Sequence, residues 1–303
     1  MKPNRQIVLK RIGILAAAVF LLFLLACVGI HGIYFSPYRD PIQTKSTFIC
    51  INELLSPSLT YSDLMDESGN LWSFSRYSQR FYLHKMSYNR DEYAFENTGT
   101  IRYSFGRATV SDYEDTINLG RITTEQSIFM GKEDPSNVLG TIDPEKHYEV
   151  WIRFREPMSL QSVHETFPSF INNAESRPNQ SGVIWIPIKS SDHPNDLCIG
   201  APGNLSLHYK NAPGSAVQDR YWMDAYLQEL AFRQSLQYLA DHSNIAEIFL
   251  NSGLYEAGNT IDFHDRLEYV QTNGVQCLGL VVYAPGRLLM EDRTLTIVKA
   301  WEC

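Results

Sequence analysis

The chain holds few groups of residues whose types and spacing could support chemistry. The most suggestive is Asp262-Phe263-His264-Asp265, where two carboxylates and an imidazole could bind a metal ion. Asp262 also stands where a helix N-cap is expected, with His264 and Asp265 in the first turn, and that arrangement is much commoner than a metal site. The pattern therefore favours a helix start, and we predict no metal ion and no cofactor.

Two further candidates are weaker. Asp192-His193 precedes Pro194 and is typical of a loop. Glu165 and Glu229 fall on two predicted helices, but the sequence gives no reason to place them at the separation that a catalytic carboxylate pair needs. The chain also lacks the HExxH zinc pair, the GxSxG nucleophile elbow and the glycine patterns that bind phosphates or dinucleotides. We therefore predict no catalytic residue and a protein that is not an enzyme.

The elements that position these residues begin with an uncharged apolar segment, residues 12–35, IGILAAAVFLLFLLACVGIHGIYF. As a helix it spans about 36 Å, enough to cross a membrane. Residues 1–11 contain four basic and no acidic side chains, so we predict that they form a cytoplasmic tail and that the C-terminal bulk lies outside. The length of the segment and its bulky end disfavour a cleavable signal peptide. The sequence thus predicts a single-pass protein of the cell membrane.

Cysteines add two open questions. The run LLAC ending at Cys27 resembles a lipoprotein box, so lipidation of Cys27 is an alternative to a permanent membrane helix, although the apolar residues that follow are atypical of lipoproteins. The remaining cysteines fall in the part predicted to be exported, where they allow three disulfide pairings that sequence cannot distinguish. No two have metal-ligand spacing, and an isolated cysteine is commonly a buried thiol. These four are Cys50, Cys198, Cys277 and Cys303.

Composition and charge agree with a folded domain outside the membrane. Hydrophobic residues make up 44% of the chain, enough for a core, and no later apolar run is long enough for a second membrane crossing. The formal net charge is −8 although the first eleven residues are basic, so the rest of the chain is distinctly acidic. An acidic domain argues against nucleic-acid binding and against tight docking on anionic lipid headgroups.

Two regions follow the apolar segment. Residues 46–142 are predicted to be mostly β, because aromatic and β-branched stretches alternate with Gly, Asn, Asp and Pro clusters. These stretches are FICINELL (48–55), LWSFSRYSQRFYLHKM (71–86), TIRYSFGRATV (100–110) and TINLGRITTEQSIFMG (116–131).

Residues 146–303 are predicted to form a mixed α/β layer, with helices packed on one sheet. Ser159 is expected to cap the first helix, and Gly274 to end the last long one in a left-handed conformation. The expected strands are 147–156, 181–188, 275–284 and 294–301, and the expected helices are 159–167, 219–242, 262–273 and the short segment 287–293. The predicted fold class is therefore α+β, with one N-terminal transmembrane helix.

The same stretches resemble the sigma factor regulator family, membrane-bound anti-sigma proteins of Gram-positive bacteria. YEVWIRFREPMSLQSV, GVIWIPI and NGVQCLGLVVYAPGRLLMEDRTLTIVKAW resemble the C-terminal domain of that family. The apolar anchor, SGNLWSFSRYSQRFYLHKM and RYSFGRA resemble its N-terminal region. The resemblance implies a regulator in signal transduction, with a sigma factor of the extracytoplasmic-function type as its direct or indirect partner.

A tail of eleven residues is too short to hold a sigma factor, because specific interfaces bury about 800 Å² per partner. We therefore expect the protein to sense an envelope condition and to act through another membrane protein. Small residues of the anchor would allow a helix of that protein to approach closely: Gly13, Ala16, Ala17 and Ala18. The alternative is a membrane-anchored module that binds a cell-wall polymer, solute or protein through exposed aromatic residues, drawn from Tyr77, Tyr82, Tyr88, Tyr93, Tyr221, Trp222 and Tyr226.

Overall fold

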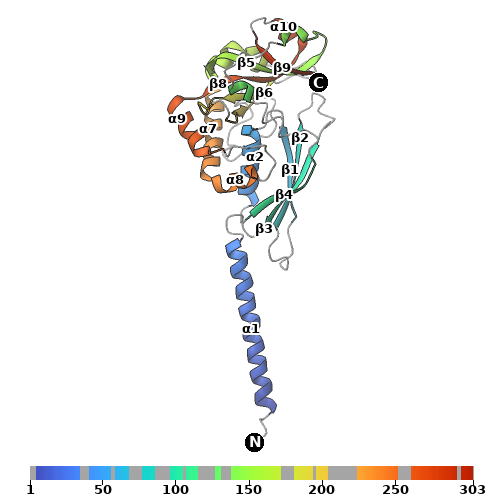
Figure 1. The fold of residues 1–303 in the computed structure, drawn as a ribbon, viewed down its shortest axis with the longest axis vertical. Coiled ribbons are helices and arrows are strands. Elements are labelled where there is room, and N and C mark those ends of the chain that lie inside the picture. The colour runs from blue at the N-terminus through green and yellow to red at the C-terminus, as the bar shows by residue number, and fades with distance from the viewer. Residues whose placement is uncertain are drawn as a thin grey trace.

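The N-terminal helix α1 extends away from the rest of the molecule (Figure 1). The computed structural model describes residues 5–34, 41–55, 59–67, 77–85, 96–104, 107–114, 127–130, 138–171, 181–193, 196–203, 224–251, 261–291 and 295–302. Helix α1 spans Arg5–Tyr34, and its window Lys10–Gly29 has a mean hydropathy of 2.8 with none of it buried. It is long and apolar enough to cross a membrane, which confirms the single N-terminal apolar helix predicted at residues 12–35.

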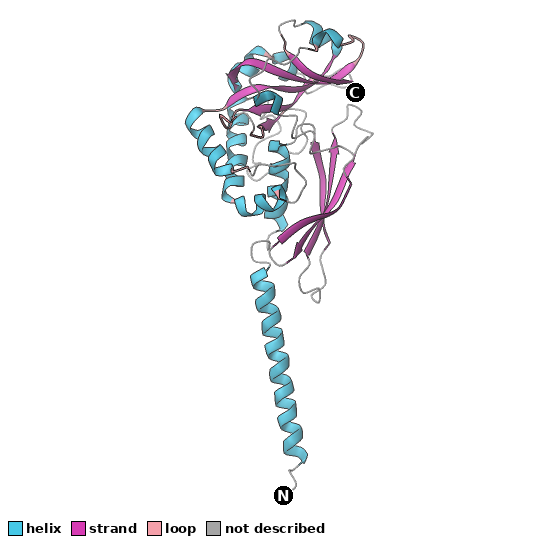
Figure 2. Cartoon of the chain, in the orientation of Figure 1, coloured by secondary structure: helices cyan, strands magenta, loops and turns pink. Residues whose placement is uncertain are grey.

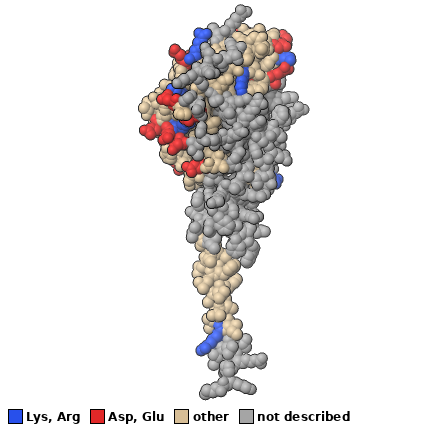
Figure 3. Space-filling model, in the orientation of Figure 1, with Lys and Arg blue, Asp and Glu red and all other residues tan. Residues whose placement is uncertain are grey.

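Exposed apolar surface is concentrated on this helix. Within its described window, the only charged side chains are Lys10 and Arg11 at the start (Figure 3). Outside α1, the large hydrophobic side chains that are exposed among the described residues are Tyr226, Leu230 and Met290. A helix that exposes apolar side chains on every face suits lipid rather than water, and this observation supports membrane insertion.

Four antiparallel strands form the first sheet, with neighbours in chain order. They are β1 Leu59–Glu67, β2 Tyr77–Lys85, β3 Glu96–Ser104 and β4 Arg107–Glu114. The stretch 100–110 supplies the end of β3 and the start of β4, with Tyr103 opposite Ala108 and Ser104 opposite Arg107. Strand β2 lies within a stretch predicted to be extended, and β3 and β4 overlap another, whereas β1 lies outside the stretches named from the sequence.

Residues 48–55 correct the sequence prediction. They were expected to be extended, but they form the second half of helix α2, Pro41–Leu55. The helix packs against α7, α8, β1 and β7, so it is covered on several sides and its residues 46–55 are all buried. A helix buried all round shows no amphipathic period, which is why its apolar run resembles a strand. Part of the stretch 116–131, also expected to be extended, is instead helix α4, Ser127–Met130.

The second sheet has five antiparallel strands in the order β7-β6-β8-β5-β9. They are β5 His147–Ser159, β6 Gly182–Ile188, β7 Ile199–Pro202, β8 Gln276–Pro285 and β9 Ile297–Glu302. The helical elements that accompany it are η2 Leu139–Thr141, α5 Leu160–Thr166, α6 Pro168–Ile171, α7 Ala225–Asp241, α8 Ser243–Leu250, α9 Phe263–Asn273 and α10 Gly286–Glu291.

This part confirms the predicted α+β layer, with three elements that the sequence did not reveal: β7, α6 and α8. The largest core cluster joins the sheet to α2 and to helices α5–α9 (Figure 2). A smaller cluster contains Trp151, Trp185 and Val281 together with Phe129 of α4, whose ring stacks on Trp151 with 5.3 Å between centroids. The sheet therefore has apolar side chains packed on both faces, as a central layer requires.

Candidate functional site

Asp262 caps helix α9 in the described structure. One carboxylate oxygen accepts hydrogen bonds from the backbone N–H of His264 at 2.8 Å and of Asp265 at 3.3 Å. Nδ1 of His264 lies 3.8 Å from the same oxygen, and both side chains are largely exposed. Gly274 ends the helix with φ 77°, as predicted. Asp262 thus accepts the free N–H groups of the first turn of α9. Among the described residues, no group of three His, Cys, Asp or Glu side chains is placed to hold a metal ion.

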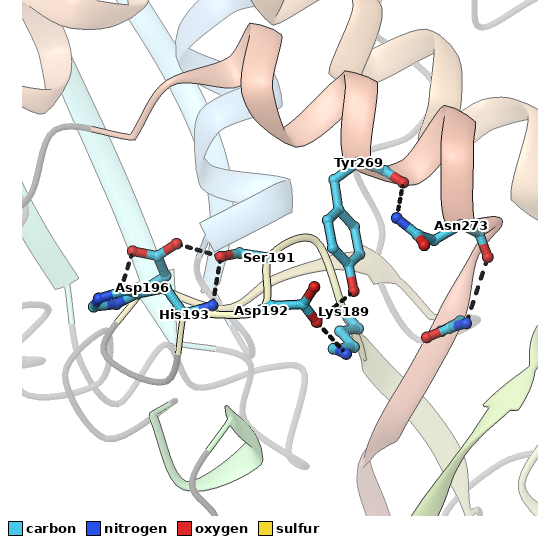
Figure 4. Close-up of polar contacts among 8 residues, drawn as sticks. Lys189, Ser191, Asp192, His193, Asp196, Tyr269 and Asn273 are labelled. Carbon is cyan, nitrogen blue, oxygen red and sulfur yellow. Dashed lines mark hydrogen bonds and ion pairs between the residues drawn. The ribbon is translucent and has the colours of Figure 1, made fainter.

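Asp192 and His193 lie in the connection between β6 and β7, which faces α9 (Figure 4). Nζ of Lys189 lies 2.6 Å from Oδ1 of Asp192, and the hydroxyl of Tyr269 on α9 donates to the same oxygen at 3.0 Å. These two hydrogen bonds lower the pKa of Asp192, and the bond to Asp192 raises the pKa of Lys189. The pair is solvent-exposed, so it positions the loop more than it stabilises the fold.

Ser191, His193 and Asp196 are the residue types of a hydrolytic triad, but their geometry differs from one. In a triad the serine hydroxyl bonds the imidazole, which in turn bonds the carboxylate. Here the Ser191 hydroxyl donates directly to Oδ2 of Asp196 and accepts from the backbone N–H of His193 at 2.9 Å (Figure 4). The His193 ring lies instead beside the other Asp196 oxygen, at 3.8 Å. The contacts order a turn, and no bond joins the Ser191 hydroxyl to the imidazole of His193 as a triad requires.

Arg266 of α9 holds this loop from the inside. Its guanidinium is 7% exposed, lies 3.0 Å from Oδ2 of Asp196 and donates to the Ser190 hydroxyl at 3.4 Å. Burial lowers the pKa of Arg266, and the charge of Asp196 opposes that effect. Sequence reasoning missed this residue. The available signal was its position one turn after the Asp262 cap, between the buried residues Phe263 and Val270 of the same helix.

The carboxylates of Glu165 and Glu229 each bond within their own helix, although the neighbouring side chains of His164 and Gln228 meet at 2.9 Å. Glu165 accepts a hydrogen bond from Gln161 of its own helix at 2.7 Å, and Glu229 pairs with Arg233 at 2.8 Å. Cys27, Cys50, Cys198 and Cys277 are free thiols, and Cys303 lies outside the described residues. Burial raises the pKa of Cys198 to about 12 and that of Cys277 further still, so neither thiol is activated as a nucleophile.

Helix α2 is the feature that connects the membrane segment to the folded part (Figure 1). Only residues 35–40 separate it from α1, and seven Cα steps reach at most about 25 Å. Contacts with the domain hold helix α2 near its start, in its middle and at its end. Near its start the Tyr238 hydroxyl of α7 donates to the Gln43 carbonyl at 3.3 Å, and in its middle the rings of Phe48 and Phe249 lie 5.1 Å apart.

At its end, α2 is held by a buried tryptophan of β6. Nε1 of Trp185 donates to the backbone carbonyl of Glu53 at 3.0 Å. The last four carbonyls of a helix lack donors within the helix, and the indole N–H supplies a donor to one of them. The indole passes over Gly200 of β7, where an added Cβ would lie 2.3 Å from Cε2 of Trp185. Gly200 therefore leaves the space through which Trp185 reaches α2.

Comparison with known proteins identifies the domain to which α2 is attached. The model of the family described as "Sigma factor regulator C-terminal" matches residues 139–291, which is just over half of the chain. The chain belongs to the sigma factor regulator family. None of the curated proteins and none of the solved structures matches it significantly. The resemblance inferred from sequence is thus confirmed, and the protein is an anti-sigma-factor-like regulator rather than a member of a known enzyme family.

Most of the aromatic residues considered for a binding surface of this sigma factor regulator lie outside the described part. Those are Tyr88, Tyr93, Tyr221 and Trp222, and the side chains of Tyr77 and Tyr82 are also not described. Tyr226 is 72% exposed, and Leu230 one turn later is 37% exposed. The described regulator therefore presents one aromatic side chain of the predicted set to solvent.

Proposed function

We propose that this sigma factor regulator is a membrane-anchored sensor whose C-terminal domain lies outside the cell and whose state passes through α2 and α1 to another membrane protein, which in turn controls the sigma factor. The observation that carries the proposal is the burial of α2. The helix that follows the membrane segment is part of the core of the regulator domain, with Phe48, Cys50 and Ile51 fully buried.

This arrangement couples the two parts mechanically. A helix packed on several sides moves only when its neighbours rearrange, so a ligand or stress that changes the packing of β7, α7 or α8 changes the position of α2. The short connection limits how much of that movement is lost before α1. The membrane window of α1 is exposed along its length, and its small residues Gly13, Ala16 and Ala17 allow close approach of a second helix.

The proposal is tested by uncoupling the two helices in the full chain. A flexible Gly/Ser insertion within residues 35–40 should leave the protein in the membrane but abolish its effect on the transcription of one sigma-factor regulon in the native host. A matched insertion of the same length within residues 252–260, between α8 and α9, controls for disturbance of the fold. Regulation that survives the first insertion, or a gene deletion that changes no sigma regulon, contradicts the proposal.

The orientation of the anchor is a separate part of the proposal. It is supported by the basic residues before the apolar window of α1. Protease added to intact protoplasts should remove the C-terminal domain, whereas a domain protected from protease would place it in the cytoplasm. In that case sensing outside the cell fails, while coupling through α2 remains testable.

A further inference from the structure

Glu53 is a buried acidic residue of α2, the helix that links the anchor to the domain. The residue is 8% exposed, and neither of its carboxyl oxygens has a hydrogen-bond partner among the described residues. The nearby Trp185 bond goes to the backbone carbonyl of Glu53 and leaves the carboxyl unaffected. An ionised carboxylate in such surroundings is strongly disfavoured, because nothing replaces its lost hydration.

Charges on the elements around α2 do not compensate for this burial. Strand β7 carries no titratable side chain, and the side chains of β1 are not described. One turn before Glu53, Cys50 is hydrogen-bonded to Ser235 of α7, and burial raises its pKa so far that it stays neutral. The other ionisable groups on α7, on α8 and at their junction are paired, distant along α2 or exposed: Glu229 with Arg233, Tyr238 beside Gln43, His242 stacked on Tyr238, and Tyr226, Asp241 and Glu247 in solvent.

We propose that Glu53 makes the docking of α2 proton-dependent, so that a protonated Glu53 holds the membrane-linked helix in the domain and ionisation of Glu53 favours its release. This inference rests on the proposed function of α2 as the connection between domain and anchor. It adds the condition to which that connection responds: the proton concentration on the side of the membrane where the domain lies.

The direction follows from the two states of the carboxyl. Burial raises the pKa of Glu53 from its ordinary value of 4.5 to about 8 in the docked helix. Released into solvent, the group returns to the ordinary value. Docking is therefore strongest below pH 4.5, and between 4.5 and about 8 the ratio of released to docked helix rises about tenfold per pH unit. Above pH 8 both states are ionised and the ratio no longer changes.

Amide hydrogen exchange on the purified full chain in detergent micelles tests this directly. The probe is the protection of α2 between about pH 5.5 and about pH 7.5, with β8 in the sheet centre as an internal reference. At each pH the wild type is compared with E53Q, which keeps the size of the side chain but cannot ionise, so the intrinsic pH dependence of exchange cancels. E247Q, which removes an exposed carboxyl from the neighbouring α8, is the matched control.

The exchange rate of α2 in the wild type, relative to E53Q, should rise up to about a hundredfold over this range, while α2 stays less protected than β8 and E247Q follows the wild type. The proposal is overturned if the ratio of the α2 exchange rates in wild type and E53Q does not change with pH. It is also overturned if E247Q removes the pH dependence as E53Q does. Equal protection of α2 and β8 overturns it as well, because α2 would then be released only by global unfolding. The exchange measurement uses no sigma factor, so it is independent of the Gly/Ser insertion test. If only the exchange test fails, the coupling of α2 to the anchor stands. If only the insertion test fails, the proton response of α2 stands.

Discussion

Replacing Trp185 by Phe removes the indole N–H that reaches α2 and keeps an aromatic ring in the core. The Glu53 carbonyl then stays buried without its donor, since Trp185 is 1% exposed and the bond at 3.0 Å is inside the core. A buried acceptor left unpaired costs about 1–3 kcal/mol. The smaller ring leaves a cavity that adds about 1 kcal/mol. We therefore expect W185F to weaken the docking of α2 by about 2–4 kcal/mol.

The matched control is W151F, because Trp151 is equally buried in the same sheet but its Nε1 bonds Glu149 of its own strand, at 3.4 Å. Amide exchange of α2 should accelerate in W185F by about 30-fold to several hundredfold and change little in W151F, at about 1.4 kcal/mol per factor of ten. The reasoning is refuted if α2 exchanges at the same rate in both variants, or if α2 in W185F is as well protected as β8 in the sheet centre. Either result would mean that Trp185 supports the sheet and does not hold the helix.

Three further predictions concern stability, and each is checked by urea unfolding of the full chain in detergent micelles. E53Q should be more stable than the wild type by an amount that grows from near zero at pH 4.5 to about 3 kcal/mol at pH 7, because the docked wild type loses stability as pH rises towards its raised pKa of about 8. R266M should cost about 2–3 kcal/mol, less than a fully buried pair because Asp196 is 27% exposed, and D196N should cost less. D262A should cost about 1 kcal/mol by removing the cap of α9, as should D224A for α7, and added zinc should leave both losses unchanged.

Local chemistry made part of the fold predictable. Ser159 accepts a hydrogen bond from the backbone N–H of Ser162 at 3.1 Å, and Asp262 does the same for α9, because a short polar side chain before an apolar period satisfies free helix donors. Gly274 takes φ 77°, a conformation that other residues avoid. The alternating run 147–156 became β5, whose Val150 and Trp151 are buried. For the two caps and the glycine the deciding interaction lies within a few residues of sequence, whereas for β5 only the apolar pattern is local and the pairing is with β8 and β9.

What the sequence did not reveal depends on contacts between distant segments. Helix α2 contains a β-branched, apolar run that suits a strand, and only its burial among α7, α8 and β7 makes a helix of it. Strand β7 is four residues long and contains Gly200 and Pro202, so it lacks a strand pattern. Arg266 looked like an ordinary surface residue of an amphipathic helix, whereas its partners Asp196 and Ser190 are about seventy positions away.

Two of the buried ionisable residues, Arg266 and Glu53, serve opposite purposes, and the difference lies in their partners. Arg266 has Asp196 and Ser190 within bonding distance, so its charge is kept and the loop it holds is fixed. Glu53 has no partner for its carboxyl among the described residues, so its charge state must change with its surroundings. A group whose ionisation opposes its own burial destabilises the element that carries it. That element is the helix next to the anchor, the one place where loosened packing would reach the membrane.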